Sequence, residues 1–283
     1  MPELFIRELK LPEEALEIPA LERAIWNDPG ESIRPGTLIA LVHEGALLAG
    51  AYAREEGSER PRLVGFIFGF PTSRPTDHHS HMAGVLPAYR DMGVGFLLKR
   101  YQRDWALSRG YERVVWTFDP LRAANAHFNL QKLGATFDRY IPNCYGPMGG
   151  INAGAPSDRV YATWELRSPR VLERLYAPPP PPKTEGLPLV NRVEGEVPLE
   201  ARLELSENRI MVQIPEDWGA ILQADPALAL AWREHSRLVF GHYLARGYRA
   251  VGFARKPNCY VLERRHAQPC EPAPPTEAEG GAF

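Results

Sequence analysis

The chain has 283 residues, of which 44% are hydrophobic, and its formal net charge at neutral pH is −2. This length allows one large or two ordinary domains, and the composition supplies a packed core. The near-neutral charge gives no support for a general nucleic-acid or membrane-surface binder, and no apolar run approaches the roughly 20 residues that cross a bilayer. We therefore expect neither a nucleic-acid partner nor a membrane-embedded segment.

The N-terminus and the cysteines indicate the compartment. The sequence MPELFIRELK lacks a basic segment followed by an apolar one, so a signal peptide is not expected. Cys144, Cys259 and Cys270 fit neither a zinc pattern nor a disulfide framework. A reducing, cytoplasmic setting is the simplest interpretation.

Hydrophobic periodicity and turn residues divide the first part of the chain into short elements. We expect, in order, a strand over 5–9, a helix over 12–26, a hairpin of strands over 38–42 and 46–53, a strand over 63–70, a polar loop over 71–79 and a strand over 80–86. We then expect a helix over 93–108, a buried strand over 114–118, a helix over 121–133, and a final hairpin over 136–140 and 160–166. A glycine- and proline-rich loop at 141–158 joins the last two strands, and loops of that length are often functional.

Five consecutive prolines at 178–182 predict a stiff spacer and a domain boundary. We expect a first domain over 1–176, a Pro-rich linker over 177–188, a smaller C-terminal α/β unit over 189–265 and a disordered tail over 266–283. Within the C-terminal unit, the pattern predicts a strand over 209–214, a helix over 226–246 and strands over 248–254 and 259–263.

The C-terminal unit repeats the order of elements in the back half of the first domain. Strand, helix, strand, strand occurs in both, and the tetrapeptide Pro-Asn-Cys-Tyr occurs at 142–145 and again at 257–260. We hypothesise a degenerate duplication. The alternative is a common arrangement with a chance tetrapeptide match, and different strand orders in the two units would contradict the duplication.

The segment from His78 to Gly95 contains the strongest sign of a ligand site. An apolar strand is followed by Pro87 and a glycine turn that opens a helix. The unpaired N–H groups and the dipole of a helix N-terminus attract phosphate, and glycines permit close approach. We predict a phosphate or pyrophosphate site, with an ordinary tight turn as the alternative, at Arg90, Asp91, Met92, Gly93, Val94 and Gly95.

This turn and the stretch VVWTFDPLRAANAHFNLQKLGA at 114–135 together resemble the GNAT acyltransferase superfamily, over residues 1 to about 168. The resemblance implies an α/β (α+β) fold with a mixed central sheet splayed between its fourth and fifth strands. It also implies acetyl-CoA or another acyl-CoA, succinyl-CoA included, as cofactor. The second stretch is similar to that of a bacterial GNAT subgroup with a C-terminal extension. Members of that subgroup have been linked with relatives of N-acylamino acid racemase and o-succinylbenzoate synthase, which implies N-acylation of amino acids.

The resemblance also implies where the chemistry takes place. The backbone N–H of Gly84 or Val85 is the expected oxyanion donor, and the base is reached from the fourth strand. His79 and His81 alternate to one face of that strand, and an imidazole titrates near neutral pH. Either histidine is therefore a candidate base, with a structural hydrogen bond as the alternative. The DHHSH run also raises a metal site, but no other ligand cluster accompanies it, so we expect no metal.

The general acid departs from the family pattern. Members of the family usually carry a tyrosine four residues before the glycine that ends the helix, and here that position is Leu130. Tyr145, Tyr140 or His127 are candidate replacements, or coenzyme A leaves as the thiolate. Cys144 keeps a covalent route open.

The same helix supplies further candidates. Asn125 and Asn129 are expected to contact the cofactor, and Arg122 and Asp119 to bind the substrate, Arg122 through a carboxylate. The alternative for Arg122 and Asp119 is helix capping and a local ion pair.

We therefore expect an N-acyltransferase in which a small amine, such as an amino acid, attacks the thioester directly. A homodimer is compatible with the sequence. A non-catalytic acyl-CoA-binding or regulatory protein is the first alternative, motivated by Leu130 and the extra unit. Protein-lysine acetylation is the second.

Overall fold

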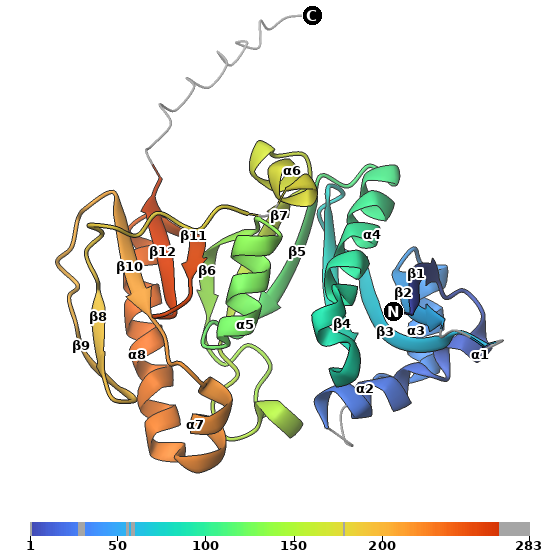
Figure 1. Ribbon diagram of the computed structural model, residues 1–283, viewed down its shortest axis with the longest axis horizontal. Coiled ribbons are helices and arrows are strands. Elements are labelled where there is room, and N and C mark those ends of the chain that lie inside the picture. Colours follow the sequence, from blue (N-terminus) through green and yellow to red (C-terminus); the bar gives the residue numbers. More distant parts are fainter. Residues whose placement is uncertain (1, 28–31, 55–56, 58–59, 178, 266–283) are drawn as a thin grey trace, which may run out of the picture.

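The computed structural model describes residues 2–27, 32–54, 57, 60–177 and 179–265 (Figure 1). The expected tail, which includes Cys270, lies outside the described residues. Across the described ranges no helix combines the length and the apolar composition that a membrane span requires.

One mixed sheet of ten strands runs through the molecule in the order β1-β2-β3-β4-β5-β7-β6-β11-β12-β10. Its first seven strands are β1 (Glu3–Glu8), β2 (Leu47–Arg54), β3 (Arg62–Pro71), β4 (Asp77–Val85), β5 (Arg113–Phe118), β6 (Thr136–Ile141) and β7 (Arg159–Glu165). The C-terminal part adds β10 (Arg209–Gln213), β11 (Tyr248–Ala254) and β12 (Cys259–Arg264). A separate hairpin consists of β8 (Asn191–Glu194) and β9 (Val197–Ala201). Only β4 and β5 pair in parallel among the named strands of the described chain.

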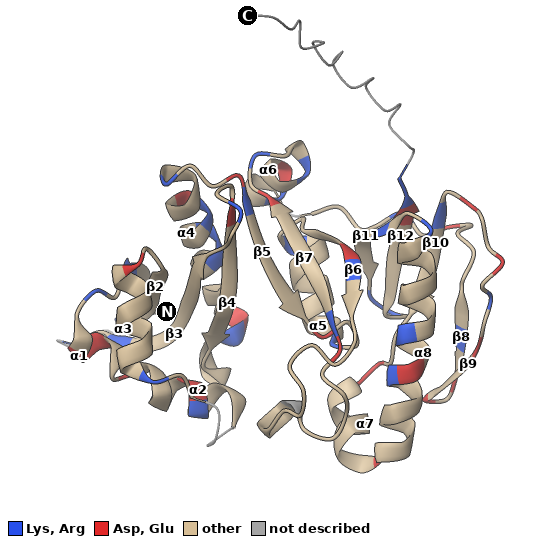
Figure 2. Cartoon of the chain, turned by 180° about the vertical axis from the view of Figure 1, so that it is seen from behind, with Lys and Arg blue, Asp and Glu red and all other residues tan. Residues whose placement is uncertain are grey.

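The helices flank this sheet (Figure 1). The first part has α1 (Pro12–Ala15), α2 (Ile18–Trp26), α3 (Pro35–His43), the 3₁₀ turn η1 (Pro87–Met92), α4 (Val94–Ser108), α5 (Ala123–Ala126) and the π-helix η2 (His127–Lys132) that continues α5. Later elements are the 3₁₀ turn η3 (Gly150–Asn152), α6 (Pro169–Tyr176), α7 (Trp218–Ala224) and α8 (Pro226–Ala245). Figure 2 shows acidic and basic positions interspersed over both parts of the chain.

Two of the sequence predictions for the N-terminal region are wrong. The apolar run 38–42 is not a strand, because Pro35 lies in the first turn of a helix that includes the run. Proline is favoured there, since its N–H is not needed and its φ is preset. The expected helix over 12–26 is two helices, and Pro19 lies in the first turn of the second.

The predicted split between the fourth and fifth strands is confirmed. All six residues of β5 pair with β7, but only Arg113–Val115 pair with β4, opposite Asp77–His79. The strand β4 also begins three residues earlier than the sequence predicted, where Arg113 Nε donates to Asp77 Oδ1 at 2.7 Å. Beyond these three pairs, the two strands diverge and leave a gap in the sheet.

The C-terminal unit has the strand order that the duplication hypothesis requires. In the first part β7 lies between β5 and β6, and in the C-terminal part β12 lies between β10 and β11. The two sets meet at β6 and β11, where Phe137 is paired with Ala250. Phe137 also packs against Phe240 and Tyr260, with ring centroids 5.7 and 5.5 Å away. The sheet and its core therefore continue across the expected linker, and the domain limits stay a prediction.

Candidate active site

A cavity of about 590 Å³ opens at the split between β4 and β5. Six residues predicted from the sequence line it: His81, Asp119, Arg122, Asn125, Asn129 and Tyr145. His79, Gly84, Val85 and the turn residues 90–95 are not part of its wall. Glu22 of α2, Lys99 of α4 and Trp116 of β5 also line the cavity, and sequence reasoning did not select them.

The glycine turn has the features of an anion site. Gly93 has a φ of 79°, a left-handed conformation that favours glycine, and α4 begins without a side-chain cap. Phe96 N–H already donates to Gly93 O at 3.0 Å, so the N–H groups that the first turn of this 15-residue helix leaves open are those of Val94 and Gly95. A Cβ on Gly95 would lie 3.9 Å from both Val85 and Phe128, in the space between β4 and η2. The turn thus leaves open backbone for a pyrophosphate beside the gap.

Arg90 has a second use in this turn. Its Nε donates to Val85 O at 3.4 Å and its Nη2 donates to Ile25 O at 3.3 Å. The guanidinium therefore ties α2 to the end of β4.

The backbone of β4 distinguishes the two expected oxyanion donors. Leu86 N–H donates to Val64 O at 2.9 Å, toward β3. Because N–H directions alternate along a strand, Gly84 N–H faces β3 and Val85 N–H faces the split. A Cβ on Gly84 would lie only 2.8 Å from Ile25 Cδ1. Glycine at this position lets α2 pack closely, and Val85 is the better-placed donor.

The two histidines lie on one face of β4, as expected, with ring centroids 5.9 Å apart. The register of β4 against β3 shifts between Ser80 and Met82, which leaves His81 as an extra residue. Such bulges re-aim side chains, and His81 lines the cavity whereas His79 packs against Phe70. Burial lowers the pKa of His81, while burial and the nearby His81 lower the pKa of His79 to about 4. Both rings are therefore neutral at pH 7, and only His81 borders the cavity.

The helix α5 and the π-helix η2 that continues it carry the two candidate asparagines. Leu133 N–H donates to Phe128 O at 2.9 Å, five residues back, as a π turn requires. Asn125 and Asn129 line the cavity, whereas Leu130 is completely buried in the core. The usual tyrosine position therefore faces away from the site in this chain.

Of the three candidate replacements for that tyrosine, only Tyr145 lines the cavity. Its hydroxyl shares a hydrogen bond of 2.6 Å with Thr117 Oγ1. The Tyr140 hydroxyl instead donates to Asp158 at 2.7 Å and pairs with Ser236 at 2.9 Å.

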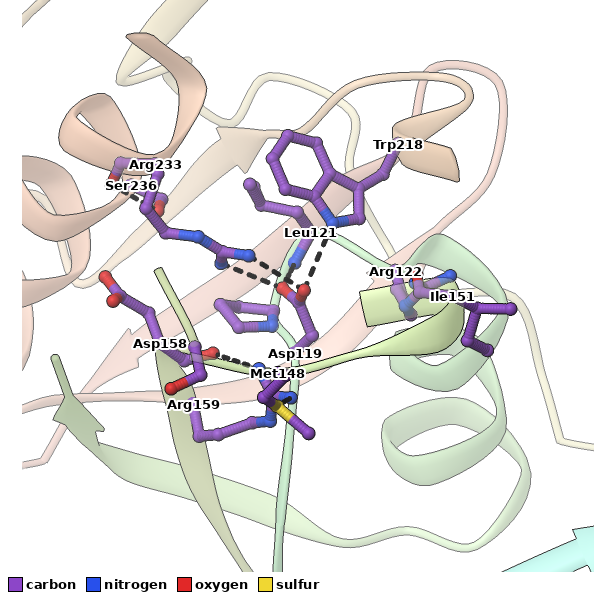
Figure 3. Close-up of polar contacts among 12 residues, drawn as sticks. Asp119, Leu121, Arg122, Met148, Ile151, Asp158, Arg159, Trp218, Arg233 and Ser236 are labelled. Carbon is purple, nitrogen blue, oxygen red and sulfur yellow. Dashed lines mark hydrogen bonds and ion pairs between the residues drawn. The ribbon is translucent and has the colours of Figure 1, made fainter. Parts of the chain in front are cut away.

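The carboxylate of Asp119 is bound by the C-terminal unit (Figure 3). Arg233 of α8 donates to both carboxylate oxygens, at 2.9 and 2.8 Å, and Trp218 Nε1 donates at 3.1 Å. Burial alone would raise the pKa of Asp119, but the Arg233 guanidinium outweighs it and lowers that pKa. Leu121 N–H also donates to Asp119 Oδ1 at 3.0 Å, but α5 begins only at Ala123 and without a side-chain cap, so the expected helix cap is not formed.

The loop 142–158 covers one side of the cavity. Arg122 Nη2 donates to Ile151 O, and Arg159 Nη2 contacts Met148 Sδ at 2.8 Å (Figure 3). Arg237 of α8 holds Asp158 at the end of this loop, at 2.6 and 2.8 Å. Both units therefore fix the loop.

The family model for the acetyltransferase (GNAT) family matches residues 13–135. Residues 13–135 therefore carry a GNAT acetyltransferase domain, as the sequence resemblance implied, although the matched segment is less than half of the chain. No curated protein sequence matches the chain.

Several solved acetyltransferase structures are similar to part of the chain. A putative acetyltransferase from Acinetobacter baylyi is 18% identical over 60% of this chain and 95% of its own, with a TM-score of 0.48. The ribosomal-protein-S18-alanine N-acetyltransferase from Escherichia coli is 16% identical over 58% and 94%, with a TM-score of 0.46. A putative acetyltransferase from Salmonella typhimurium, solved with its cofactor acetyl-CoA, is 19% identical over 59% and 95%, with a TM-score of 0.44.

Proposed function

We propose that this protein is an acyl-CoA-dependent N-acyltransferase whose acceptor is a small-molecule amine, such as an amino acid. The observation that carries the proposal is the gap between β4 and β5, which has an uncapped helix N-terminus at its mouth and a cavity beside it. The loop 142–158 supports a small acceptor, because Tyr145, Met148 and Ile151 wall the cavity. A protein-lysine acceptor would need a wide groove at this place.

The chain's residues fit an acyl-CoA, with acetyl-CoA or succinyl-CoA as the donors to test. Gly93, Val94 and Gly95 would hold its pyrophosphate, and Asn125 and Asn129 would contact the arm that follows. When bound, an acyl-CoA supplies a thioester whose carbonyl carbon an amine can attack. No three His, Cys, Asp or Glu side chains in the described ranges are grouped as a metal site would need.

His81 is the proposed base. Its neutral ring borders the cavity and can accept a proton from the attacking amine. Val85 N–H faces the split beside the glycine turn, where it can donate to the arm of the bound cofactor.

The acceptor would lie between α2 and the loop. Glu22 is buried there and accepts a hydrogen bond from Ile33 N–H at 3.2 Å. Its carboxylate suits an ammonium group, and Arg122 suits a carboxylate, so the pair would bind an amino acid at both ends. We propose a structural role for Asp119, because its oxygens already accept bonds from Arg233 and Trp218.

The test is to mix the full chain with acetyl-CoA or succinyl-CoA and pooled D- and L-amino acids, and to measure free thiol. We expect thiol release that depends on the amine and is lost in His81→Gln. Tight coenzyme binding with no thiol release for any amine would favour the non-catalytic alternative. Transfer only to lysines of added protein would favour the second alternative.

A further inference from the structure

Lys99 is a buried ammonium group that the proposed mechanism has not used. Its residue is 4% exposed, and its Nζ donates to Ser80 Oγ at 2.8 Å and to Gln102 Oε1 at 3.0 Å. The Nζ also lies 4.1 Å from the centroid of the Trp116 ring. Within the described part of the chain, no carboxylate oxygen comes within ion-pair distance of this Nζ. A buried positive charge without a counter-charge is costly, so its retention needs a reason.

Lys99 lies beside the place where the thioester would react. Ser80 and Trp116 each follow the last paired residue of their strand, so Lys99 Nζ lies where β4 and β5 begin to part. Lys99, Ser80 and Trp116 all line the cavity, together with His81. The ammonium is therefore at the inner end of the gap in which the thioester would lie.

The groups around Lys99 set its protonation. On β4, His78 and His79 face it closely enough that its charge contributes to lowering the pKa of each. From β5 it meets the Trp116 ring, and from α4 it meets the Gln102 amide. Burial lowers the pKa of Lys99 to about 7, so the amine exchanges its proton readily near neutral pH.

We propose that Lys99 is the catalytic residue that protonates the leaving thiolate, in place of the tyrosine that Leu130 replaces. This inference rests on the proposed function. Lys99 Nζ gives one proton to the sulfur as the carbon–sulfur bond breaks, and becomes a neutral amine. The new carbon–nitrogen bond forms with the acceptor amine, whose proton passes to His81. Solvent then returns a proton to Lys99 and takes one from His81, so no other reactant is needed.

Tyr145 is the competing donor within the cavity wall. It is 46% exposed, lies on the loop and shares its hydroxyl with Thr117. Lys99 instead comes from a helix that begins at the glycine turn, so one rigid element would support both the pyrophosphate and the thioester.

The first experiment measures binding and needs no acceptor. Titrate the full chain with coenzyme A and with desulfo-coenzyme A, which lacks the sulfur, over a range of pH. An ammonium beside the sulfur favours the thiolate, so the native protein should prefer coenzyme A by about 10-fold or more. Lys99→Met should lose this preference but keep its affinity for desulfo-coenzyme A, which shows that it is folded. Lys99→Arg should keep part of the preference, because it keeps the charge.

The second experiment measures turnover. Both Lys99→Met and Lys99→Arg should lower kcat by about 10²-fold or more, because neither side chain donates a proton at neutral pH. The native rate should fall as pH rises through about 7, where Lys99 loses its proton, and this alkaline limb should vanish in Lys99→Met. The exposed Lys132→Met, outside the cavity wall, is the matched control.

The outcomes separate the two proposals. A native protein that neither binds coenzyme A nor releases thiol would contradict the proposed function. Native activity together with a Lys99→Met variant that keeps its sulfur preference and its alkaline limb would overturn only the role of Lys99. A loss confined to donors with a carboxylate on the acyl group would also overturn it, and would make Lys99 a residue that recognises the acyl chain.

Discussion

The two strand–helix–strand–strand sets of this sheet have the same strand order, but the outer edge of the first set is open and that of the second is paired. In the first set, β5 parts from β4 after three paired residues. In the second, the equivalent strand β10 is paired on its outer edge by the segment 188–191. Val190 N–H donates to Met211 O at 2.8 Å, and Met211 N–H donates to Pro188 O at 2.8 Å. The Asn191 side chain then bonds both N–H and C=O of Gln213, each at 2.9 Å.

This difference shows that the shared arrangement does not by itself make a site. The gap forms because β4 diverges from β5, and the open N–H groups lie in the glycine turn that follows β4. The second set has neither feature, and its helix α8 instead directs Arg233 and Arg237 at carboxylates of the first set. One set therefore forms the proposed site while the other supports its rim.

The largest effect on activity is expected at His81, the bulged residue of β4. His81→Gln should lower kcat by about 10²–10⁴-fold, because the variant has no base at the cavity. In the native protein, activity should rise with pH along an acidic limb whose midpoint lies below the usual histidine pKa, since burial lowers the pKa of His81, before it falls through about 7 as Lys99 loses its proton. The measurement is thiol release across pH. His79→Gln, outside the cavity wall, should lose far less, and an equal loss would assign the chemistry to His79 as well.

The ion pair that joins the two sets should have the next largest effect. Asp119→Asn leaves Arg233 buried without its counter-charge and should lower the free energy of unfolding by about 3–5 kcal/mol. Although burial opposes it, Arg233 lowers the pKa of Asp119. The stabilisation is therefore complete above the ordinary carboxyl pKa and is lost as pH falls through the lowered one. Urea unfolding should show the variant and the native protein converging in acid.

The matched control for that experiment is a surface pair. Glu3 pairs with Arg54 at 3.2 Å, and their side chains are 65% and 51% exposed, so Glu3→Gln should cost less than about 1 kcal/mol. A similar cost for both variants would contradict the supporting role of the C-terminal set.

Adding a side chain at the open edge of the first set tests whether the cofactor binds there. Gly95→Val places atoms in the space between Val85 and Phe128, and should weaken coenzyme A binding by about 10–100-fold. Gly241 of α8 has no atom within 4 Å of its ideal Cβ, so Gly241→Val should leave binding unchanged. Calorimetric titration measures both, and equal affinities would place the cofactor elsewhere.

The smallest effect is expected at the N-terminus of α8. The Asp225 side chain accepts from Leu228 N–H at 2.9 Å, whereas α4 has no side-chain cap. Asp225→Ala should cost about 1 kcal/mol of stability in urea unfolding. Coenzyme A affinity should not change, and a drop there would show that the two helix ends are coupled.

The sequence predicts the parts of the site that depend on local pattern. The turn 90–95 and the stretch 114–135 predict the split sheet through the family resemblance. The alternation of side chains along a β-strand predicts that the two histidines lie on one face. The apolar run 38–42 misleads, because it has no period that separates a strand from a helix. Lys99 lies in a predicted amphipathic helix, and nothing nearby in the chain marks it as buried. Only the packing of α4 on β4 and β5 does so.

Long-range partners are the other limit. Asp119 has the local context of a cleft residue, but its partner Arg233 lies 114 positions later. No spacing rule links two residues so far apart. The pairing of β10 with the segment 188–191 could not be predicted for the same reason, since 188–191 has no strand pattern of its own.

Arg233 and Arg237 are four residues apart, so a single turn of α8 fixes the separation of Asp119 and Asp158. Asp158 is fully buried and Asp119 nearly so. A chain cut at the prolines would keep every residue of the proposed cavity and yet leave both carboxylates without their cations. The proline segment therefore connects two parts that have become mutually dependent, and an acyltransferase reduced to its first 176 residues would not be expected to persist as a folded protein.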